Sequence, residues 1–284
     1  MTRLSEILHD LMERGIEAAL VRVATAQGSA PREAGATMLV TAEDCFGTIG
    51  GGKLEWEAIA AARRMLETGA ESAAMALPLG PALGQCCGGR VTLAIARADA
   101  GTLAALQAGE RAADRARPTV LLFGAGHVGR ALATALAPLP LALTWIDGRT
   151  DAFPKAPPPG IAIRHSENPV AEVAAAPARA AYLVMTHSHA LDFDIVEAVL
   201  RRGDFVYAGL IGSTTKRRRF RGRFVGRGGD AARFARLTCP IGGVGLRDKR
   251  PEVIAALAAA EVLGPLLGEH AAADEQGRQA WEAR

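Results

Sequence analysis

Residues 119–129 read TVLLFGAGHVG, and this stretch decides the fold of the second half of the chain. Residues 119–123 are apolar or β-branched, which predicts a buried parallel strand. Three glycines in the pattern G-x-G-x-x-G follow at once, namely Gly124, Gly126 and Gly129, and a helical pattern covers residues 130–137. In this context the first glycine makes a tight turn, the second lets a pyrophosphate approach, and the third lets helix and strand pack closely. The stretch therefore predicts a Rossmann-type unit.

Two further features bear on what this unit binds. The start of the predicted helix, with His127 in its first turn, would present backbone N–H groups and partial positive charge to phosphates. The next apolar run ends in Asp147, 21 residues after Gly126, where an acid that binds ribose is expected. Arg149 could instead accept a 2′-phosphate, so the cofactor could be NAD(P). The alternative is that the glycines serve helix–strand packing alone.

Composition and length set the frame for the whole chain. Its 284 residues suffice for two domains, and 49% hydrophobic with 22% charged residues is ordinary globular composition. A net charge of +3 gives no reason to expect nucleic-acid binding. We see no signal peptide and no apolar run of 18 residues, so we expect a cytoplasmic protein that does not enter a membrane. The four cysteines are expected to be thiols.

The predicted fold class is α/β, with an N-terminal mixed α/β domain followed by a C-terminal Rossmann-like domain with a parallel sheet. We place the first domain at residues 1–105 and the second at 119–267. The charged, alanine-rich segment 106–118 reads as a linker, and the polar residues 268–284 read as a flexible tail.

A second glycine cluster lies in the first domain. Gly50, Gly51 and Gly52 directly precede a helical pattern that starts near Lys53 and ends near Thr68. Consecutive glycines expose backbone N–H groups that can hold a phosphate or carboxylate. The other interpretation is a tight turn between a strand and a helix.

Two neighbouring thiols form the third candidate site. Cys86 and Cys87 are flanked by glycines in GQCCGG, residues 84–89, so that a ligand or metal can approach them closely. Backbone N–H groups nearby also favour the thiolate, and we name Cys87 as the candidate metal ligand. The alternative is a turn with one buried, inert cysteine. Without a second Cys or His pair at metal spacing, a structural zinc site is not expected.

Two polar loops follow predicted strands of the second domain, where open α/β sheets bind ligands. His187 and His189 stand in THSH, with Asp192 and Asp194 beyond them, and could hold a metal or move a proton. Ser213 and Lys216 stand in GLIGSTTK, which leads into the basic run Arg217–Arg219 and could bind phosphate or an acidic partner. The alternatives are helix capping for the first loop and a solvated helix face for the second.

Taken together, these segments resemble the XdhC/CoxI family of molybdenum-enzyme accessory proteins. The resemblance rests on seven motifs in one order, and it covers nearly the whole chain: GSAPREAGATMLV (28–40), GTIGGGKLE (47–55), GQCCGG (84–89), FGAGHVGRAL (123–132), THSHALD (186–192), GLIGSTTKRRR (209–219) and CPIGGVGL (239–246). It implies two domains and a protein that binds molybdenum cofactor, a molybdopterin with a terminal phosphate. It further implies protection of the cofactor, its sulfuration with a cysteine desulfurase, and its insertion into xanthine dehydrogenase.

Three hypotheses follow. The first is a cofactor-binding chaperone, which we expect to be a homodimer and not itself an enzyme. The second is an NAD(P)-dependent oxidoreductase, for which His187 or His189 could be the acid or base. The third is an interaction protein that uses the Rossmann fold only as a scaffold. The resemblance favours the first hypothesis, whereas the residues alone leave the first two nearly level.

Overall fold

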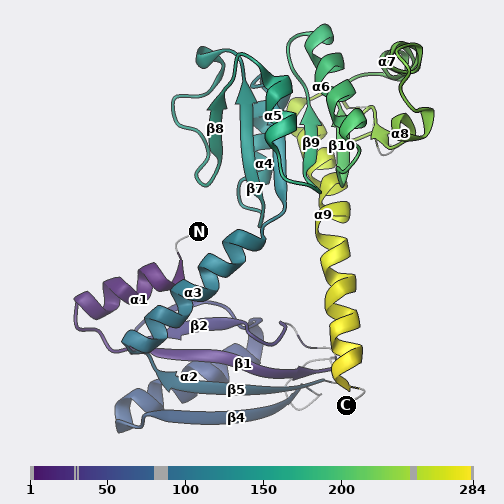
Figure 1. The fold of residues 1–284 in the computed structure, drawn as a ribbon. Helices are drawn as coiled ribbons and strands as arrows, with labels where there is room; N and C mark the ends of the chain where they lie inside the picture. Colours follow the sequence, from purple (N-terminus) through teal and green to yellow (C-terminus); the bar gives the residue numbers. More distant parts are fainter. Residues whose placement is uncertain (1–2, 29, 31, 80–88, 244–247, 283–284) are drawn as a thin grey trace. The chain divides into compact units, whose positions relative to one another are not determined.

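The structure is a computed structural model that describes residues 3–28, 30, 32–79, 89–243 and 248–282. The chain forms two compact units, Met1–Arg115 and Ala116–Arg284 (Figure 1).

The first unit contains a five-stranded antiparallel sheet in the order β3-β2-β1-β5-β4 among its described residues. The strands are β1 (Ala19–Gln27), β2 (Thr37–Val40), β3 (Cys45–Gly47), β4 (Ser72–Leu79) and β5 (Gly89–Arg97). The helices are α1 (Leu4–Glu13), α2 (Gly52–Thr68) and α3 (Ala100–Ala116).

Helices cover both faces of this sheet. Successive side chains of β1 point to opposite faces and pack against different helices. Val21 packs in a core with Leu54, Ala58, Ala62 and Met65, which form one stripe of α2. Leu20 points the other way and packs with Leu8 and Leu11 of α1. Successive strand residues face opposite sides, so one strand contributes to two separate cores.

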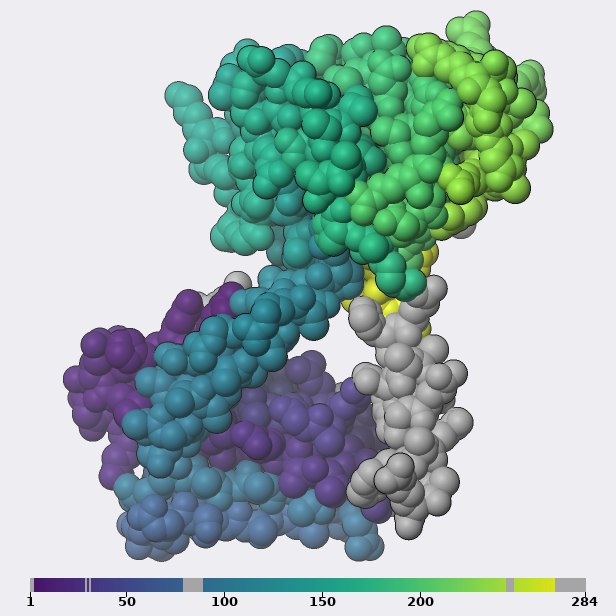
Figure 2. All heavy atoms as spheres, in the orientation of Figure 1, coloured from purple at the N-terminus to yellow at the C-terminus, as the bar shows by residue number. Residues whose placement is uncertain are grey.

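The segment expected to be a linker, 106–118, lies mostly in helix α3. Leu103 and Leu106 pack against the α1 core, and Glu110 accepts hydrogen bonds from the backbone N–H and hydroxyl of Ser5. Asp114 forms an ion pair with Arg3. These positions follow one another at helical spacing, and Figure 2 shows α3 lying against α1 at the surface of the unit. The alanine-rich segment is therefore a packed helix.

The second unit contains a six-stranded parallel sheet in the order β11-β10-β9-β6-β7-β8 among its described residues. The strands are β6 (Thr119–Phe123), β7 (Ala142–Asp147), β8 (Ala162–His165), β9 (Ala181–Val184), β10 (Tyr207–Leu210) and β11 (Leu237–Thr238). Counted within this unit, the order is 3-2-1-4-5-6, that of a Rossmann fold. The predicted fold class is confirmed.

Helices also cover both faces of the parallel sheet. One core contains α4 (His127–Leu136) and α9 (Pro251–Glu282), and the other contains α5 (Pro169–Ala175), α6 (His189–Arg202), α7 (Thr214–Gly226) and α8 (Ala231–Ala235). The central strands β6, β9 and β10 are buried on both faces, as is typical of parallel strands, whereas the edge strand β8 is exposed along its length. A 3₁₀ turn, Thr150–Ala152, follows β7.

Helix α9 differs from two expectations. It continues to Glu282 and so includes most of the segment expected to be a flexible tail. Its stretch Pro251–Gly268 has a mean hydropathy of 1.5, so by length and composition alone it could cross a membrane. Five of its side chains are buried against the sheet: Ala255, Ala258, Ala259, Val262 and Leu266. Packing in the core therefore accounts for part of the apolar composition, since 28% of this stretch is buried.

The glycine-rich turn shows directly why its glycines are needed. Gly124 has φ +109°, and a Cβ there would lie 2.2 Å from the carbonyl oxygen of Met185. A Cβ on Gly129 would lie 2.0 Å from the carbonyl oxygen of Gly124. A Cβ on Gly126 would meet no atom within 4 Å. The first and third glycines are thus fixed by packing, whereas the second faces open space.

This difference predicts the effect of two substitutions. Gly129→Val should lower the free energy of unfolding of the second unit by about 3 kcal/mol, because backbone must move to admit the side chain. Gly126→Ala is the matched control and should cost at most about 1 kcal/mol, because Ala is a poorer N-cap than Gly but its Cβ meets no neighbour. Urea unfolding with far-UV circular dichroism measures both. Equal stability of the two variants would contradict the packing role of Gly129.

Candidate functional site

The candidate site is a cleft at the carboxyl ends of β6, β7 and β9. The strand order reverses at β6, because β7 pairs with one of its edges and β9 with the other. Such a switch point is where open α/β sheets bind ligands. The cavity there has a volume of about 300 Å³. It is lined by Phe123, Gly124, Ile146, Asp147, Gly148, Arg149, Ser166, Glu167, Pro169, Thr186, His187 and Leu191.

Helix α4 begins beside this cleft, and no side chain caps its N-terminus. Its N-cap residue is Gly126, which is exposed and extended, with φ −73°. The first N–H groups of a helix lack partners within the helix. Helices α5 to α8 satisfy this requirement with side-chain caps, respectively Asn168, Ser188, Ser213 and Asp230. Among helices α4 to α8, α4 is therefore the one suited to receive an anion from outside.

Asp147 is the last residue of β7, and both of its carboxylate oxygens accept hydrogen bonds from the chain itself. Its Oδ2 accepts hydrogen bonds from Ala125 N at 2.7 Å and Arg149 Nη2 at 3.0 Å. Its Oδ1 accepts from the backbone N and Nε of Arg149, at 2.9 and 3.0 Å. Burial raises the pKa of Asp147, but these hydrogen bonds outweigh it and hold the pKa below its ordinary value.

A carboxylate has about four acceptor positions, and all four of Asp147 are used. Its predicted contact with a ribose would require one of these hydrogen bonds to break. The Arg149 side chain is 43% exposed and presents positive charge at the same cleft. The site thus offers a cation and helix N–H groups, which suit phosphate better than a diol.

Lys216 and Ser213, both predicted to bind a cofactor, have structural partners. Lys216 Nζ donates to Asp192 Oδ2 at 2.6 Å and to the carbonyl oxygen of Ile211 at 3.0 Å. Asp192 is almost completely buried, and its other oxygen accepts from the backbone N–H and hydroxyl of Thr186. Ser213 accepts from Lys216 N and caps α7. This network joins the ends of β9 and β10 and positions Thr186 in the cleft wall.

The three histidines that were predicted as site residues lie in different surroundings. His187 is exposed and lines the cleft, whereas His189 begins α6 outside its lining. His127 is exposed in the first turn of α4 and lines a separate surface groove with Arg130. No cluster of three potential metal ligands occurs among the described residues. His187 is therefore the histidine that the structure brings to the candidate site.

The glycine cluster of the first unit already holds an anion from its own chain. Glu55 Oε2 accepts from Ile49 N at 3.0 Å, from Gly51 N at 3.1 Å and from the Thr48 hydroxyl. Gly50, Gly51 and Gly52 all have positive φ, which opens the turn to the carboxylate. We expected this nest to bind an external phosphate or carboxylate. Because α2 brings Glu55 back to its own N-terminus, the nest is filled by the chain itself.

Two of the four cysteines, Cys45 and Cys239, lie among the described residues. Cys86 and Cys87, including the proposed metal ligand, lie outside the described residues. Cys239 is buried, and burial raises its pKa to about 11, so it is a poor nucleophile near neutral pH. Cys45 is exposed in β3.

Sequence reasoning missed three polar residues of the cleft, namely Ser166, Glu167 and Thr186. Thr186 begins the THSH loop two residues after β9, so the strand-end position that pointed to His187 applied to it as well. Ser166 and Glu167 directly follow β8, a short edge strand with four exposed residues, and their position at its end was likewise not used.

Comparison with known proteins identifies the family. The XdhC Rossmann domain matches residues 120–262, and the XdhC and CoxI family matches residues 11–77. The chain belongs to this family. Its Rossmann part includes the uncapped α4, the Asp147–Arg149 pair and the Thr186 loop.

Two further similarities are informative. The uncharacterized protein YqeB of Escherichia coli (strain K12) is 28% identical over 258 residues, which cover 89% of this chain and 44% of YqeB. The chain thus spans less than half the length of that relative. A crystal structure described as a xanthine dehydrogenase from Bacillus halodurans has a TM-score of 0.75, with 94% of this chain and 96% of that chain covered. At 17% identity this likeness shows a shared fold.

The Glu55 arrangement predicts a specific pH dependence. Burial raises the pKa of Glu55, but hydrogen bonds from Thr48, Ile49 and Gly51 lower it below its ordinary value. Because the pKa is lower in the folded chain, the carboxylate stabilises the fold fully above the unfolded pKa of ~4.3, and this contribution is lost as the pH falls through the folded value. Glu55→Ala should lower the free energy of unfolding by about 1–2 kcal/mol at pH 7, and by less below about pH 4.

Glu57→Ala is the matched control, because Glu57 stands on the same helix and contacts exposed Lys53 at 3.9 Å. It should cost about 0.5 kcal/mol or less at either pH. Urea titrations at pH 7 and pH 3.5 measure both variants. If Glu55→Ala lowers the free energy of unfolding equally at both pH values, the negative charge of Glu55 does not stabilise the glycine turn.

Proposed function

We propose that this protein binds molybdenum cofactor in the cleft of its Rossmann unit and serves the maturation of xanthine dehydrogenase. The observation that carries the proposal is the uncapped N-terminus of α4 at the sheet's switch point. Membership of the XdhC and CoxI family supports the choice of cofactor and of the enzyme served. When bound, the cofactor would supply the molybdenum centre of the dehydrogenase.

The residues of the cleft fit the terminal phosphate of a molybdopterin. The backbone N–H groups that begin α4 would receive the phosphate oxygens, and exposed Gly126 leaves room for their approach. Arg149 would add a charge-assisted hydrogen bond and is held in place by Asp147. His187 and Thr186 line the same cavity and would contact the remainder of the ligand.

The finer steps belong to the same proposal. We propose that the protein protects the cofactor in the cytoplasm, supports its sulfuration with a cysteine desulfurase, and inserts it into the dehydrogenase. Cys86 and Cys87 remain the proposed sulfur contacts, with Cys87 as the proposed metal ligand. Their flanking glycines in GQCCGG support this role, because they minimise crowding around the thiols.

A second candidate, NADP binding for an oxidoreductase, is favoured by one observation. Asp147 is occupied by Arg149, so the cleft presents a guanidinium where a ribose acid would be free in an NAD site. A 2′-phosphate fits that guanidinium. Measuring NADP and NAD bound to the purified protein tests this candidate, and binding of NAD in preference would contradict it.

Substitution of Gly126 tests the main proposal. Gly126→Asp should leave thermal stability unchanged or raise it, because Asp is a good helix cap and its Cβ meets no neighbour. The added carboxylate should repel the phosphate and reduce cofactor retention at least tenfold. Gly126→Asn is the matched control, of the same size without the charge, and should retain more. Each variant is purified from cells that make the cofactor. Its molybdenum content and the fluorescence of its oxidised pterin are then measured. If the Asp variant and the parent retain equal amounts of cofactor, the N-terminus of α4 is not part of the binding site.

A further inference from the structure

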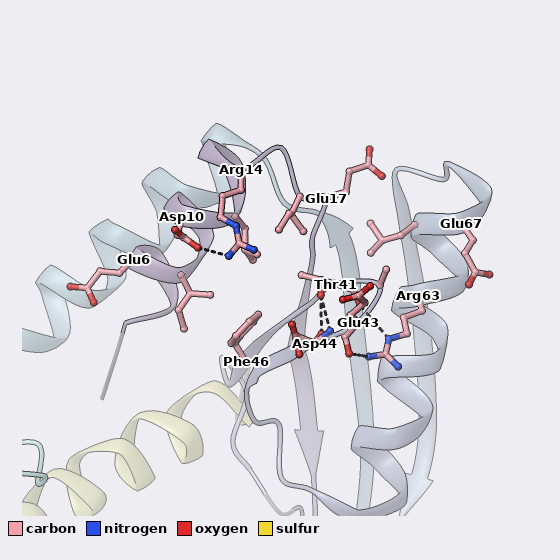
Figure 3. Close-up of a pocket in the computed structure, with 15 residues that line it drawn as sticks. Glu6, Asp10, Arg14, Glu17, Thr41, Glu43, Asp44, Phe46, Arg63 and Glu67 are labelled. Atoms are coloured by element: carbon pink, nitrogen blue, oxygen red, sulfur yellow. Dashed lines mark hydrogen bonds and ion pairs between the residues drawn. The ribbon is translucent and has the colours of Figure 1, made fainter.

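The first unit has a groove of about 780 Å³ that the proposed cofactor site does not use. Its walls come from α1, from the segment before β1, from the turn between β2 and β3, and from the C-terminal half of α2 (Figure 3). Arg63 on α2 fixes that turn by donating to the carbonyl oxygens of Thr41 at 3.2 Å and Glu43 at 2.7 Å. The groove is therefore built from regular elements and one tethered turn.

The lining of the groove combines an apolar interior with an acidic rim. Ile7, Ile16, Phe46 and Leu66 line it and are only partly buried. Its charged members are six carboxylates and two guanidiniums, so the rim is negative: Glu6, Asp10, Glu17, Glu43, Asp44, Glu67, Arg14 and Arg63. Asp10 and Glu17 form ion pairs, with Arg14 and Arg97. Among the described residues, the carboxylates of Glu43, Asp44 and Glu67 form none.

The second unit carries a surface of opposite charge. Helix α7 contains six basic residues and no acidic residue, in the sequence TTKRRRFRGRFVG. Arg218 and Arg221 are exposed, and neither forms an ion pair among the described residues. Val225 lies on the same helix face at spacings of seven and four residues and is 40% exposed. This face, which we call the α7 face, consists of Arg218, Arg221 and Val225.

We propose that the groove of one copy of this chain receives the α7 face of a second copy. The apolar interior would cover Val225 and the aliphatic stems of the arginines. The guanidiniums would meet Glu43, Asp44 and Glu67, which have no internal partner to give up. A carboxylate that has no existing ion pair can bind an arginine of the second copy without first losing another electrostatic interaction. The two surfaces differ, so a dimer of this kind would contain the contact twice, once in each direction.

The contact can be tested by charge reversal on each surface. Sedimentation velocity from 1 to 100 μM should show association of the full chain, with a dissociation constant that rises at least tenfold between 50 and 500 mM NaCl. Glu43→Lys with Glu67→Lys on the groove, or Arg218→Glu with Arg221→Glu on α7, should raise it at least tenfold. Lys155→Glu, an exposed reversal elsewhere in the second unit, is the control and should leave it unchanged.

The decisive measurement is a mixture of the two reversed variants. Each variant repels itself, but an equimolar mixture pairs every acidic surface with a basic one and should restore dimers. Circular dichroism confirms that each variant is folded. The proposal is overturned if the parent is monomeric throughout, if both variants associate like the parent, or if the mixture does not dimerise.

Discussion

The close approach of α4 to the turn after β6 is the constraint on which the candidate site depends. The carbonyl oxygen of Gly124 accepts a hydrogen bond from the buried indole of Trp145 at 2.9 Å, and it lies so near Gly129 that no Cβ fits between them. The indole fixes the turn, and the missing side chain lets the helix begin directly above it. The helix N-terminus is consequently held at the carboxyl end of β6, at the edge where the strand order reverses.

Three carboxylates beside polar loops are satisfied within the chain, which makes the uncapped helix informative. Asp147 binds Ala125 N and Arg149, Asp192 binds Thr186 and Lys216, and Glu55 fills the glycine nest of the first unit. Each of these carboxylates accepts from backbone N–H groups in a loop, so each performs internally the role that an external anion could have had. A chain that satisfies its loops so consistently leaves α4 open for a reason other than poor packing.

The sequence predicted the parallel sheet well because buried strands and a glycine-rich turn leave a strong local pattern. It did not predict α3, because residues 106–118 look polar until Leu103, Leu106 and Glu110 are read as one helical face against α1. It also missed β4, a mostly exposed edge strand that contains Pro78. Within the candidate site, Gly124, Asp147 and His187 were predicted from position, and the structure brings all three to the cleft.

The role of Lys216 could not be read from sequence, because it depends on a residue brought near by folding, whereas Ser213 and Gly50–Gly52 have partners within a few residues, Lys216 N and Glu55, that local capping patterns could have indicated. Lys216 looks like a phosphate ligand until Asp192 is found beside it, 24 residues away in the chain.

The distribution of charge matters more than its sum. The net charge of +3 suggests an unremarkable surface, yet the groove of the first unit is lined by six carboxylates and α7 carries six basic residues. Opposite charges concentrated on separate surfaces attract partners at long range, whereas the same charges interspersed would cancel within a Debye length of ~10 Å at 0.1 M salt. Several groove carboxylates and several α7 arginines also form no ion pair within the part of the chain that the structure describes, unlike Asp147 and Asp192. Exposed charges elsewhere do form ion pairs, such as Arg164 with Glu172 and Arg201 with Glu197, so the unpaired charges of these two surfaces are a distinct feature. We infer that recognition of other molecules, rather than stability, explains where this protein keeps its unpaired charge.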